Sequence, residues 1–220
     1  MKRLFDIICS LIVLILFLPF GSIIILILKF TGEGEIFYKQ SRTGKNGEQF
    51  GIYKFVTMVK DSPNIGAGDI TLKNDSRVLP FGKFLRKTKL NEFPQFLNVL
   101  AGEMSFVGPR PLVKNQYDMI HRNLKQKIIK LKPGITGIGS IIFRDEERFL
   151  EDNKEDSNEF YKTKIVPFKA KLECWYEENM SLFIDSLLII TTIIMVFFPD
   201  TKIHKYFFRD LPQHPLFNPA

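Results

Sequence analysis

The first 30 residues contain an almost unbroken apolar run. Between Leu4 and Leu28 it is interrupted only by Asp6, Cys9, Ser10, Pro19, Gly21 and Ser22. At a rise of about 1.5 Å per residue, an α-helix of this length could cross a hydrocarbon core of roughly 30 Å. The pattern therefore predicts a membrane helix over residues 1–30.

Two features of this run predict a helix that enters one leaflet, bends and returns. Pro19 lies near the middle, where proline removes a helical hydrogen bond and kinks the axis. Basic residues flank both ends, with Lys2 and Arg3 before the run and Lys29 and Lys39 after it, and positive flanks favour the cytoplasmic side. We therefore expect a re-entrant helix with Pro19 as its membrane kink. A single span is the alternative, and a cleaved signal peptide fits less well because no small-residue cleavage site follows.

A second apolar run extends from Leu182 to Phe198 and ends at Pro199. It is short for a transmembrane helix, so an interfacial or domain-covering helix is the preferred interpretation. Asp185 near its start then needs no burial in the membrane and favours the positive end of the helix.

The segments between these runs predict a small sheet and several helices. Ile36–Tyr38 and Gln49–Met58 are rich in aromatic and β-branched residues and are separated by the turn-forming sequence SRTGKNGE, which is typical of a β-hairpin. The Gly/Pro/Asp-rich stretch from Asp61 to Ser76 is expected to form a surface loop that could carry ligand contacts.

Apolar residues then recur at helical spacing from Phe93 to Leu100, which predicts a helix with Asn91 as its N-cap and Gly102 at its end. A second amphipathic helix is expected over Gln116–Leu131, and partial helix over Glu146–Asn179. The predicted fold class is α+β. It has a mainly helical cytosolic domain over residues 31–220 with a small β-hairpin, an N-terminal re-entrant membrane helix, and a C-terminal interfacial helix over residues 182–198.

Charge and composition restrict the partners. The chain has 31 Lys and Arg against 24 Asp and Glu, a net charge of +7, which favours phosphate-rich ligands or an anionic membrane face. No zinc-finger, basic-zipper or RNP pattern accompanies this charge, so we expect no nucleic-acid partner. The two cysteines and three histidines are scattered, so a metal ion is expected to be a hard cation held by oxygen ligands.

The densest charged segment runs from Leu85 to Pro111. Arg86, Lys87 and Lys89 immediately precede the predicted helix at Asn91, and a helix N-terminus with basic neighbours is a natural phosphate site. Glu92 supplies an oxygen ligand that could hold Mg²⁺ against a diphosphate.

Further along the same segment, Arg110 stands between Pro109 and Pro111. Two prolines restrict the backbone and preorganise the guanidinium for a bidentate phosphate contact. Each of these signals is weak alone, since basic residues near a helix start and Gly-Pro turns are common. Their concentration in one short segment predicts a phosphate site.

At this point the chain resembles the bacterial sugar transferases, a family of monotopic phosphoglycosyl transferases. The resemblance covers roughly residues 2 to 190. The motifs that carry it are Lys2-Arg3-Leu4-Phe5-Asp6, Arg42-Thr43-Gly44, Tyr53-Lys54-Phe55, Phe81 to Thr88, Glu92-Phe93-Pro94-Gln95, Asn98-Val99-Leu100, Gly102-Glu103-Met104-Ser105, Val107-Gly108-Pro109-Arg110-Pro111, Lys132 to Gly137, and Trp175 to Asp185.

The resemblance implies a membrane-bound enzyme that uses Mg²⁺ to transfer a sugar-1-phosphate from a UDP-sugar to undecaprenyl phosphate, with release of UMP. It would act at the cytoplasmic face of the bacterial inner membrane, in contact with membrane lipid, and a homodimer is an open alternative for its oligomeric state. The residues expected in the site are Glu92, Asn91 and Arg86 as catalytic residues, Arg110, Lys54, Arg42, Lys87, Pro109 and Pro111 as substrate-binding residues, and Glu92 as the metal ligand.

The sequence departs from the family at Asn91. The family pair is Asp-Glu, in which the aspartate attacks the β-phosphorus, and an amide has no anionic oxygen with which to do so. Three hypotheses remain. The lipid phosphate attacks directly or Glu92 is the nucleophile, another carboxylate such as Asp75 attacks, or the chain has lost its chemistry and serves as a membrane scaffold or sugar-nucleotide-binding homologue.

Other segments of the chain bear on its activity and on its sugar specificity. Some branches of the family resemble this chain in combining Asn-Glu with Val56 and with a run like Phe143 to Glu147, so the substitution would mark a branch. The segment Ile138 to Ile141 replaces a Gly-Trp-Ala-Gln-like sequence, so the sugar specificity is not carried over. Asp145, Glu146 and Glu147 could contact substrate or metal, or could simply form a charged helix start.

Overall fold

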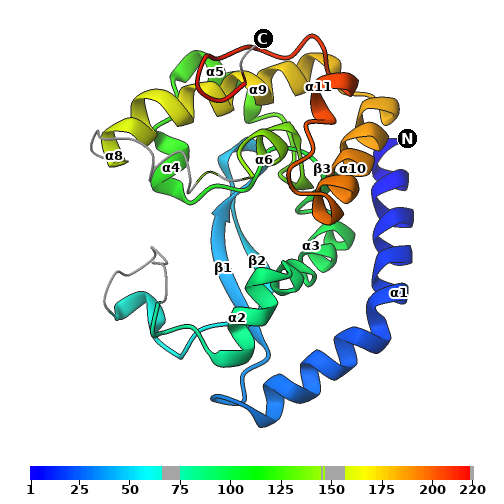
Figure 1. Ribbon diagram of the computed structural model, residues 1–220, viewed down its shortest axis with the longest axis vertical. Helices are drawn as coiled ribbons and strands as arrows, with labels where there is room; N and C mark the ends of the chain where they lie inside the picture. The colour runs from blue at the N-terminus through cyan, green and yellow to red at the C-terminus, as the bar shows by residue number, and fades with distance from the viewer. Residues whose placement is uncertain (66–74, 145, 147–156, 219–220) are drawn as a thin grey trace.

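The structure is a computed structural model that describes residues 1–65, 75–144, 146 and 157–218. These residues form a mainly helical α+β fold with two small sheets and one long N-terminal helix (Figure 1). The helices are α1 (Lys2–Phe30), α2 (Pro80–Lys87), α3 (Gln95–Ala101), α4 (Lys114–Asp118), α5 (Arg122–Ile128), α6 (Ile138–Ile142), α8 (Ser157–Phe160), α9 (Val166–Asn179), α10 (Leu182–Phe197) and α11 (His204–Phe207).

The strands are β1 (Phe37–Thr43), β2 (Gln49–Phe55), β3 (Ser105–Val107) and β4 (Gly134–Thr136). Short 3₁₀ turns cover Lys45–Gly47, Ser62–Asn64 and Leu90–Glu92, and one π-helical turn, Tyr161–Ile165, joins α8 to α9.

Helix α1 is 29 residues long and contains Pro19. It is long and apolar enough to cross a membrane, judged by length and composition. Figure 1 shows it bending part-way along its length, with the rest of the protein on the inner side of the bend, and an internal proline is a sufficient cause of such a kink. Many of its large apolar side chains are exposed, including Leu4, Ile15 and Phe20.

The first residues of α1 are fixed to the folded domain by buried polar contacts. The Nζ atom of Lys2 lies 2.6 Å from Oδ2 of Asp185, whose side chain is fully buried, and the Tyr176 hydroxyl donates to the other Asp185 oxygen at 2.6 Å. Asp6 accepts hydrogen bonds from the Ser105 hydroxyl and from the Phe106 backbone N–H at 3.0 Å. The sequence placed Asp185 in the first turn of its helix correctly, but did not reveal its partner.

The second half of α1 packs against the domain through apolar side chains. Ile24 and Leu28 are buried in one cluster with Phe55 of β2 and Leu85 of α2. The two ends of α1 therefore contact the same folded unit.

The predicted hairpin is present. Strands β1 and β2 pair antiparallel from Phe37↔Phe55 to Thr43↔Gln49. Fully buried Asn98 of α3 holds the hairpin: its Oδ1 accepts from the Tyr53 N–H at 3.0 Å, and its Nδ2 donates to the Gly51 carbonyl at 2.8 Å and to Glu103 at 2.7 Å. Because these bonds satisfy a buried amide on several sides, they fix the hairpin against α3.

The sequence did not predict the second sheet, in which β3 and β4 pair in parallel. The backbones approach closely where Gly108 follows β3 and Gly134 begins β4. A Cβ atom on Gly108 would lie 2.2 Å from the Lys132 carbonyl oxygen, and one on Gly134 would lie 2.1 Å from the Gly108 nitrogen. Only glycine fits there, and this crossing sets the path of the Pro109–Pro111 segment.

Two helix predictions were wrong in their boundaries. Asn91 is not an N-cap, because Leu90–Glu92 forms a separate 3₁₀ turn and α3 begins at Gln95, after Pro94. The predicted helix over Gln116–Leu131 is split into α4 and α5, because the backbone is extended at His121 (φ −55°, ψ 137°). Gly102 does end α3, in a left-handed conformation with φ 87°.

The C-terminal region closes the largest hydrophobic cluster. The charged stretch is helical in the part described, as α8, the π turn and α9, and α10 follows as predicted. After α10 the chain crosses back over α9 (Figure 1) and buries Phe208, Leu211 and Phe217 in the cluster that contains Ile165 and Leu172.

We predict that Asp185→Asn lowers the stability of the protein by about 2 kcal/mol, because the buried side chain loses the charge that pairs with half-buried Lys2 and one of its two acceptor oxygens. Thermal unfolding in detergent micelles measures the change. Asp118→Asn is the matched control, since Asp118 forms an exposed pair with Lys125, and such pairs contribute about 1 kcal/mol or less. Equal stability of the two variants would contradict the structural role of the Lys2–Asp185 pair.

Candidate functional site

A small polar hollow, open to solvent, lies where the hairpin, the Leu90–Glu92 turn and the two parallel strands meet. Its lining residues come from four separate parts of the chain. They are Arg42, Ile52, Lys54, Glu92, Gln95, Arg110, Pro111, Gly134 and Ile135. Arg42, Lys54, Glu92, Arg110 and Pro111, all expected from the sequence, are thus brought together.

The hairpin places two cations on one face. Alternation along β1 puts Gln40 and Arg42 on the same side, and the register brings Lys54 of β2 beside them. The side-chain amide oxygen Oε1 of Gln40 accepts hydrogen bonds from the Arg42 guanidinium at 2.7 Å and from the Lys54 ammonium at 3.2 Å. Gln40 therefore orients both cations.

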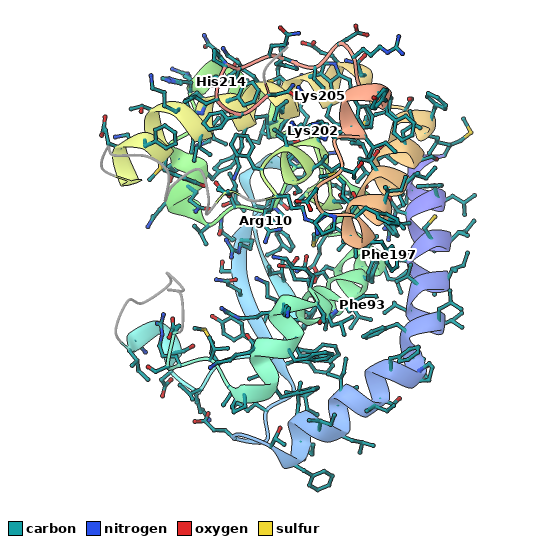
Figure 2. All side chains as sticks on the ribbon, viewed as in Figure 1. Phe93, Arg110, Phe197, Lys202, Lys205 and His214 are labelled. Carbon is teal, nitrogen blue, oxygen red and sulfur yellow. The ribbon has the colours of Figure 1, made fainter. Side chains whose placement is uncertain are left out.

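Glu92 faces Arg110 across the hollow. Its Oε1 lies 3.2 Å from an Arg110 guanidinium nitrogen. Pro109 and Pro111 are buried whereas Arg110 is exposed, so the prolines anchor the backbone and the guanidinium extends outward, beside the hairpin (Figure 2). Burial alone would raise the pKa of Glu92, but the charges of Arg110, Lys54 and Lys89 outweigh it and hold that pKa below its ordinary value.

Lys54 is the most strongly perturbed cation of the hollow. Burial, together with the charges of Arg42, Arg110 and Arg86, lowers its pKa to about 8, although the charge of Glu92 opposes the shift. An anionic ligand close to Lys54 would stabilise the charged form of this side chain.

Four expected residues lie outside the lining, namely Arg86, Lys87, Asn91 and Pro109. The Arg86 guanidinium donates to the Thr57 hydroxyl at 3.0 Å and contacts the Met58 sulfur at 3.4 Å, so it supports the chain next to Lys54. Lys87 is exposed at the end of α2. Asp75, the alternative nucleophile, accepts hydrogen bonds from Arg77 on both carboxylate oxygens, the shortest at 2.6 Å. Of the other acidic candidates, Asp145 and Glu147 lie outside the described residues.

Asn91 lies in the 3₁₀ turn next to Glu92. Its side-chain oxygen is buried and, within the described part of the chain, has no hydrogen-bond partner. The N–H groups that follow are already paired, because those of Glu92 and Phe93 donate to the carbonyls of Lys89 and Leu90. The phosphate site expected at a helix N-terminus is therefore absent at Asn91, and the cationic side chains that line the hollow are those of Arg42, Lys54 and Arg110.

The oxygen atoms near this turn bear on the expected metal ion. Among the described residues there is no group of three or more His, Cys, Asp or Glu that could hold a metal by itself. Mg²⁺ is commonly bound through one or two protein oxygens plus substrate phosphates. The Glu92 carboxylate and the unpaired Asn91 oxygen are hard ligands of this kind, so the residues present fit a Mg²⁺ ion that arrives with a diphosphate.

Sequence reasoning did not single out several residues of the site. Gln95 is buried and lines the hollow, and its place in the Glu-Phe-Pro-Gln motif was the available signal. Gln40 could have been found from its period-two spacing with Arg42. Phe93 stacks on Phe17 of α1 with ring centroids 3.7 Å apart and lies on the α1 side of the fold (Figure 2).

The arrangement can bind and neutralise a phosphate-rich ligand beside an apolar helix. Against this geometry, the chain matches the family model described as bacterial sugar transferase over residues 1–199. The chain belongs to the bacterial sugar transferase family. The match includes α1, the hairpin and every residue that lines the hollow.

Curated relatives carry specific names. The chain is 31% identical over 206 residues to exopolysaccharide production protein ExoY of Rhizobium meliloti, covering 87% of this chain and 83% of the relative. It is 32% identical to undecaprenyl-phosphate galactose phosphotransferase of Salmonella typhimurium, covering 89% of this chain and 40% of the relative. It is 43% identical to UDP-glucose:undecaprenyl-phosphate glucose-1-phosphate transferase of Klebsiella pneumoniae, covering 64% of this chain and 30% of the relative.

These coverages differ in kind. The chain spans most of the ExoY relative, but less than half the length of the Salmonella and Klebsiella relatives.

We predict that the affinity for UDP-glucose, used as a diphosphate probe, falls as pH rises through about 8. Lys54 is charged below its lowered pKa and neutral above it, so its attraction for phosphate is lost in the alkaline direction. Isothermal titration from pH 7 to 9 measures this. Lys54→Arg keeps its charge over the whole range and should remove the dependence; the same slope in both proteins would show that Lys54 does not contact the diphosphate.

Proposed function

We propose that this chain transfers a sugar-1-phosphate from a UDP-sugar to undecaprenyl phosphate and releases UMP, as the first membrane step of surface polysaccharide or glycoconjugate synthesis. The observation that carries the proposal is the placement of Glu92 among Arg42, Lys54 and Arg110, next in sequence to Phe93, which stacks on Phe17 of the apolar helix α1. The names of relatives that transfer galactose or glucose phosphate to undecaprenyl phosphate support the same reaction.

The side chains would act mainly by positioning and charge. A phosphoryl transfer brings two anionic substrates together, and most catalysis of such reactions comes from alignment and electrostatic stabilisation. Arg42, Lys54 and Arg110 would hold the diphosphate, and Glu92 would balance the cations and keep Arg110 oriented. Mg²⁺ bound by Glu92 and the Asn91 oxygen would supply further charge neutralisation on the diphosphate.

The nucleophile follows from Asn91. An amide oxygen does not form a stable phosphoryl intermediate as a carboxylate does. We propose that an oxygen of the lipid phosphate attacks the β-phosphorus directly. The new bond joins that oxygen to the β-phosphorus. The bond between the β-phosphorus and the oxygen that bridges the two phosphates of the donor breaks, and UMP leaves with that oxygen. Both oxygens of Asp75 are engaged by Arg77, so Asp75 is a poor alternative, and ionised Glu92 is the covalent alternative to be tested.

The contacts of α1 support a re-entrant path. Lys2 and Asp6 pair with Asp185 and Ser105 at one end of the helix, and Leu28 is buried against Phe55 near the other. A helix tied to one domain at both ends cannot place those ends on opposite sides of a bilayer. We therefore propose residues 1–30 as a re-entrant membrane helix and residues 31–220 as a domain on the cytoplasmic face of the bacterial inner membrane.

The exposed face of α10 fits the proposed interfacial role. Phe183, Ile193 and Phe197 are exposed, whereas Leu188 and Met195 are buried in the main cluster. One face of α10 would thus contact lipid while the other covers the domain. In this arrangement the acceptor phosphate reaches the hollow without leaving the membrane surface.

We predict that Glu92→Gln and Arg110→Ala each lower UMP release by 100-fold or more, since each removes charge from the reacting groups, about 2.7 kcal/mol or more of stabilisation. A coupled UMP assay with a panel of UDP-sugars, Mg²⁺ and undecaprenyl phosphate measures this. Lys202→Ala, at an exposed lysine that does not line the hollow, should leave the rate unchanged. Full activity of the two site variants, or no UMP release by the parent with any donor, would favour a non-catalytic scaffold.

We predict no sugar-phosphate adduct on the protein after incubation with donor in the absence of acceptor. Direct attack forms no covalent intermediate, so the intact mass should be unchanged. The Asn91→Asp variant is the informative comparison, because it restores a carboxylate at the position of the family nucleophile. An adduct on the parent protein would refute direct attack, and peptide mapping would then identify Glu92, Asp75 or another residue.

We predict that a cysteine introduced at position 1 and one introduced at Lys45 react from the same side of inverted membrane vesicles. Membrane-impermeant maleimide labelling in a variant whose Cys9 and Cys174 are replaced by serine measures the accessibility. Labelling of the two positions from opposite sides would show a single span and refute re-entry.

A further inference from the structure

A second polar cluster centres on Lys169 of α9. Lys169 of α9 donates to Oε1 of Glu146 at 2.6 Å. Its ammonium also lies over the Phe143 ring at 5.0 Å and over the Tyr161 ring at 5.7 Å. One carboxylate and two aromatic rings thus fix a half-buried lysine in a defined position.

The position of Tyr161 connects this cluster to the hollow. Tyr161 packs in the same hydrophobic cluster as Leu112, which is two residues beyond Arg110 and accepts a hydrogen bond from the Thr43 N–H at 2.8 Å. Burial and the charge of Glu146 raise the pKa of Tyr161, while the charges of Arg110 and Arg42 act against that rise. Arg110 likewise contributes to a lowered pKa of Lys169, after burial. The cluster therefore adjoins the Arg42–Arg110 side of the hollow.

The local backbone is unusual at this point. Tyr161 begins the π-helical turn between α8 and α9, and π turns inside helices are frequent at functional sites. The turn shifts the side chains that follow out of the regular helical order.

A residue from the C-terminal region, Phe217, packs against the aromatic side chains of this cluster. Phe217 packs against Phe143 at a centroid distance of 5.0 Å and against Phe168 at 5.8 Å. The family match ends at residue 199, so Phe217 lies beyond it. The ring that backs Phe143 and Lys169 therefore comes from outside the region shared with the family.

A deeper acidic group completes the cluster. Glu173 lies one helical turn after Lys169. Burial raises its pKa to about 8, although the charge of Lys169 and a hydrogen bond from the Gly139 N–H act against the rise. Its Oε2 atom is buried and has no hydrogen-bond partner among the residues described. A plain structural ion pair between Lys169 and Glu146 leaves this unpaired oxygen unexplained.

We propose that Glu146, Tyr161 and Lys169 form a subsite that binds a vicinal diol of the nucleotide-sugar donor. The inference rests on the proposed function. A carboxylate that accepts from two hydroxyls, beside a phenol and an ammonium that donate, matches the donors and acceptors of a diol. The donor carries such a diol on its ribose and on its hexose, and both are attached to the diphosphate that Arg42 and Arg110 would hold.

Ligand pairs that differ in one hydroxyl test the proposal by binding alone. The full-length protein in nanodiscs is titrated with UMP and 2′-deoxy-UMP, and with UDP-glucose and UDP-galactose, by calorimetry. The variants are Glu146→Gln, Tyr161→Phe and Lys169→Met. Lys127→Met is the matched control. Lys127 of α5 also pairs with a glutamate, Glu178 of α9, but both side chains of this pair are exposed. Thermal unfolding of each variant checks that the fold is kept.

The expected result is that the parent discriminates within at least one pair by about 10-fold, the value of one charged hydrogen bond, and that the Glu146 and Lys169 variants reduce this ratio to about one. Loss of the ratio for the UMP pair assigns the subsite to ribose, and loss for the UDP-sugar pair assigns it to the hexose. The proposal is overturned if both ratios are the same in the parent, the three variants and Lys127→Met. Failure of the parent to bind any of the four ligands would overturn the proposed function as well.

Discussion

The attachment of α1 to the folded domain at both ends is the constraint on which the rest of the structure depends. A charged Lys2 and a fully buried Asp185 pair at 2.6 Å, which is favourable only because Tyr176 and nearby backbone carbonyls satisfy the remaining polar atoms. At the other end, Ile24 and Leu28 share an apolar cluster with the hairpin and α2. The long apolar helix is therefore an integral part of the folded domain.

Three separate contacts fix the geometry of the site, and one of them is made by α1. Leu90 and Phe93, on either side of Asn91 and Glu92, pack against the cluster that contains Ile24 and Leu28 of α1, and Phe93 stacks on Phe17 of the same helix, so α1 helps to hold the Leu90–Glu92 turn. Asn98 fixes the hairpin that carries Arg42 and Lys54, and the close approach of Gly108 and Gly134 sets the path of Arg110. The segments that carry Arg42, Lys54 and Arg110 are thus each fixed by contacts of their own. This fixed backbone holds the three cations close together around Glu92 despite their mutual repulsion.

Periodic patterns predicted most of the elements, because local spacing decides whether a segment is helix or strand. The apolar run gave α1 and α10, and the aromatic stretches around SRTGKNGE gave β1 and β2. The parallel pair β3–β4 was not predictable, since three-residue strands have no period and their pairing depends on contacts distant in sequence. The Asn91 cap failed because Pro94 moved the helix start to Gln95. Motifs identified Glu92 and Arg110, but Gln40, Tyr161 and Lys169 reach the site only through tertiary packing.

The central claim is that a phosphate group moves from a soluble donor to a membrane lipid at this site. Its most direct test uses UDP-sugars labelled with ³²P at the β-phosphate, incubated with the protein, Mg²⁺ and undecaprenyl phosphate in nanodiscs, followed by organic extraction. The account predicts that label appears in the lipid fraction with at least one sugar, in amounts equal to the UMP released. Label that stays in the aqueous phase as free sugar phosphate, or that remains in the intact donor for every sugar tested, would contradict it.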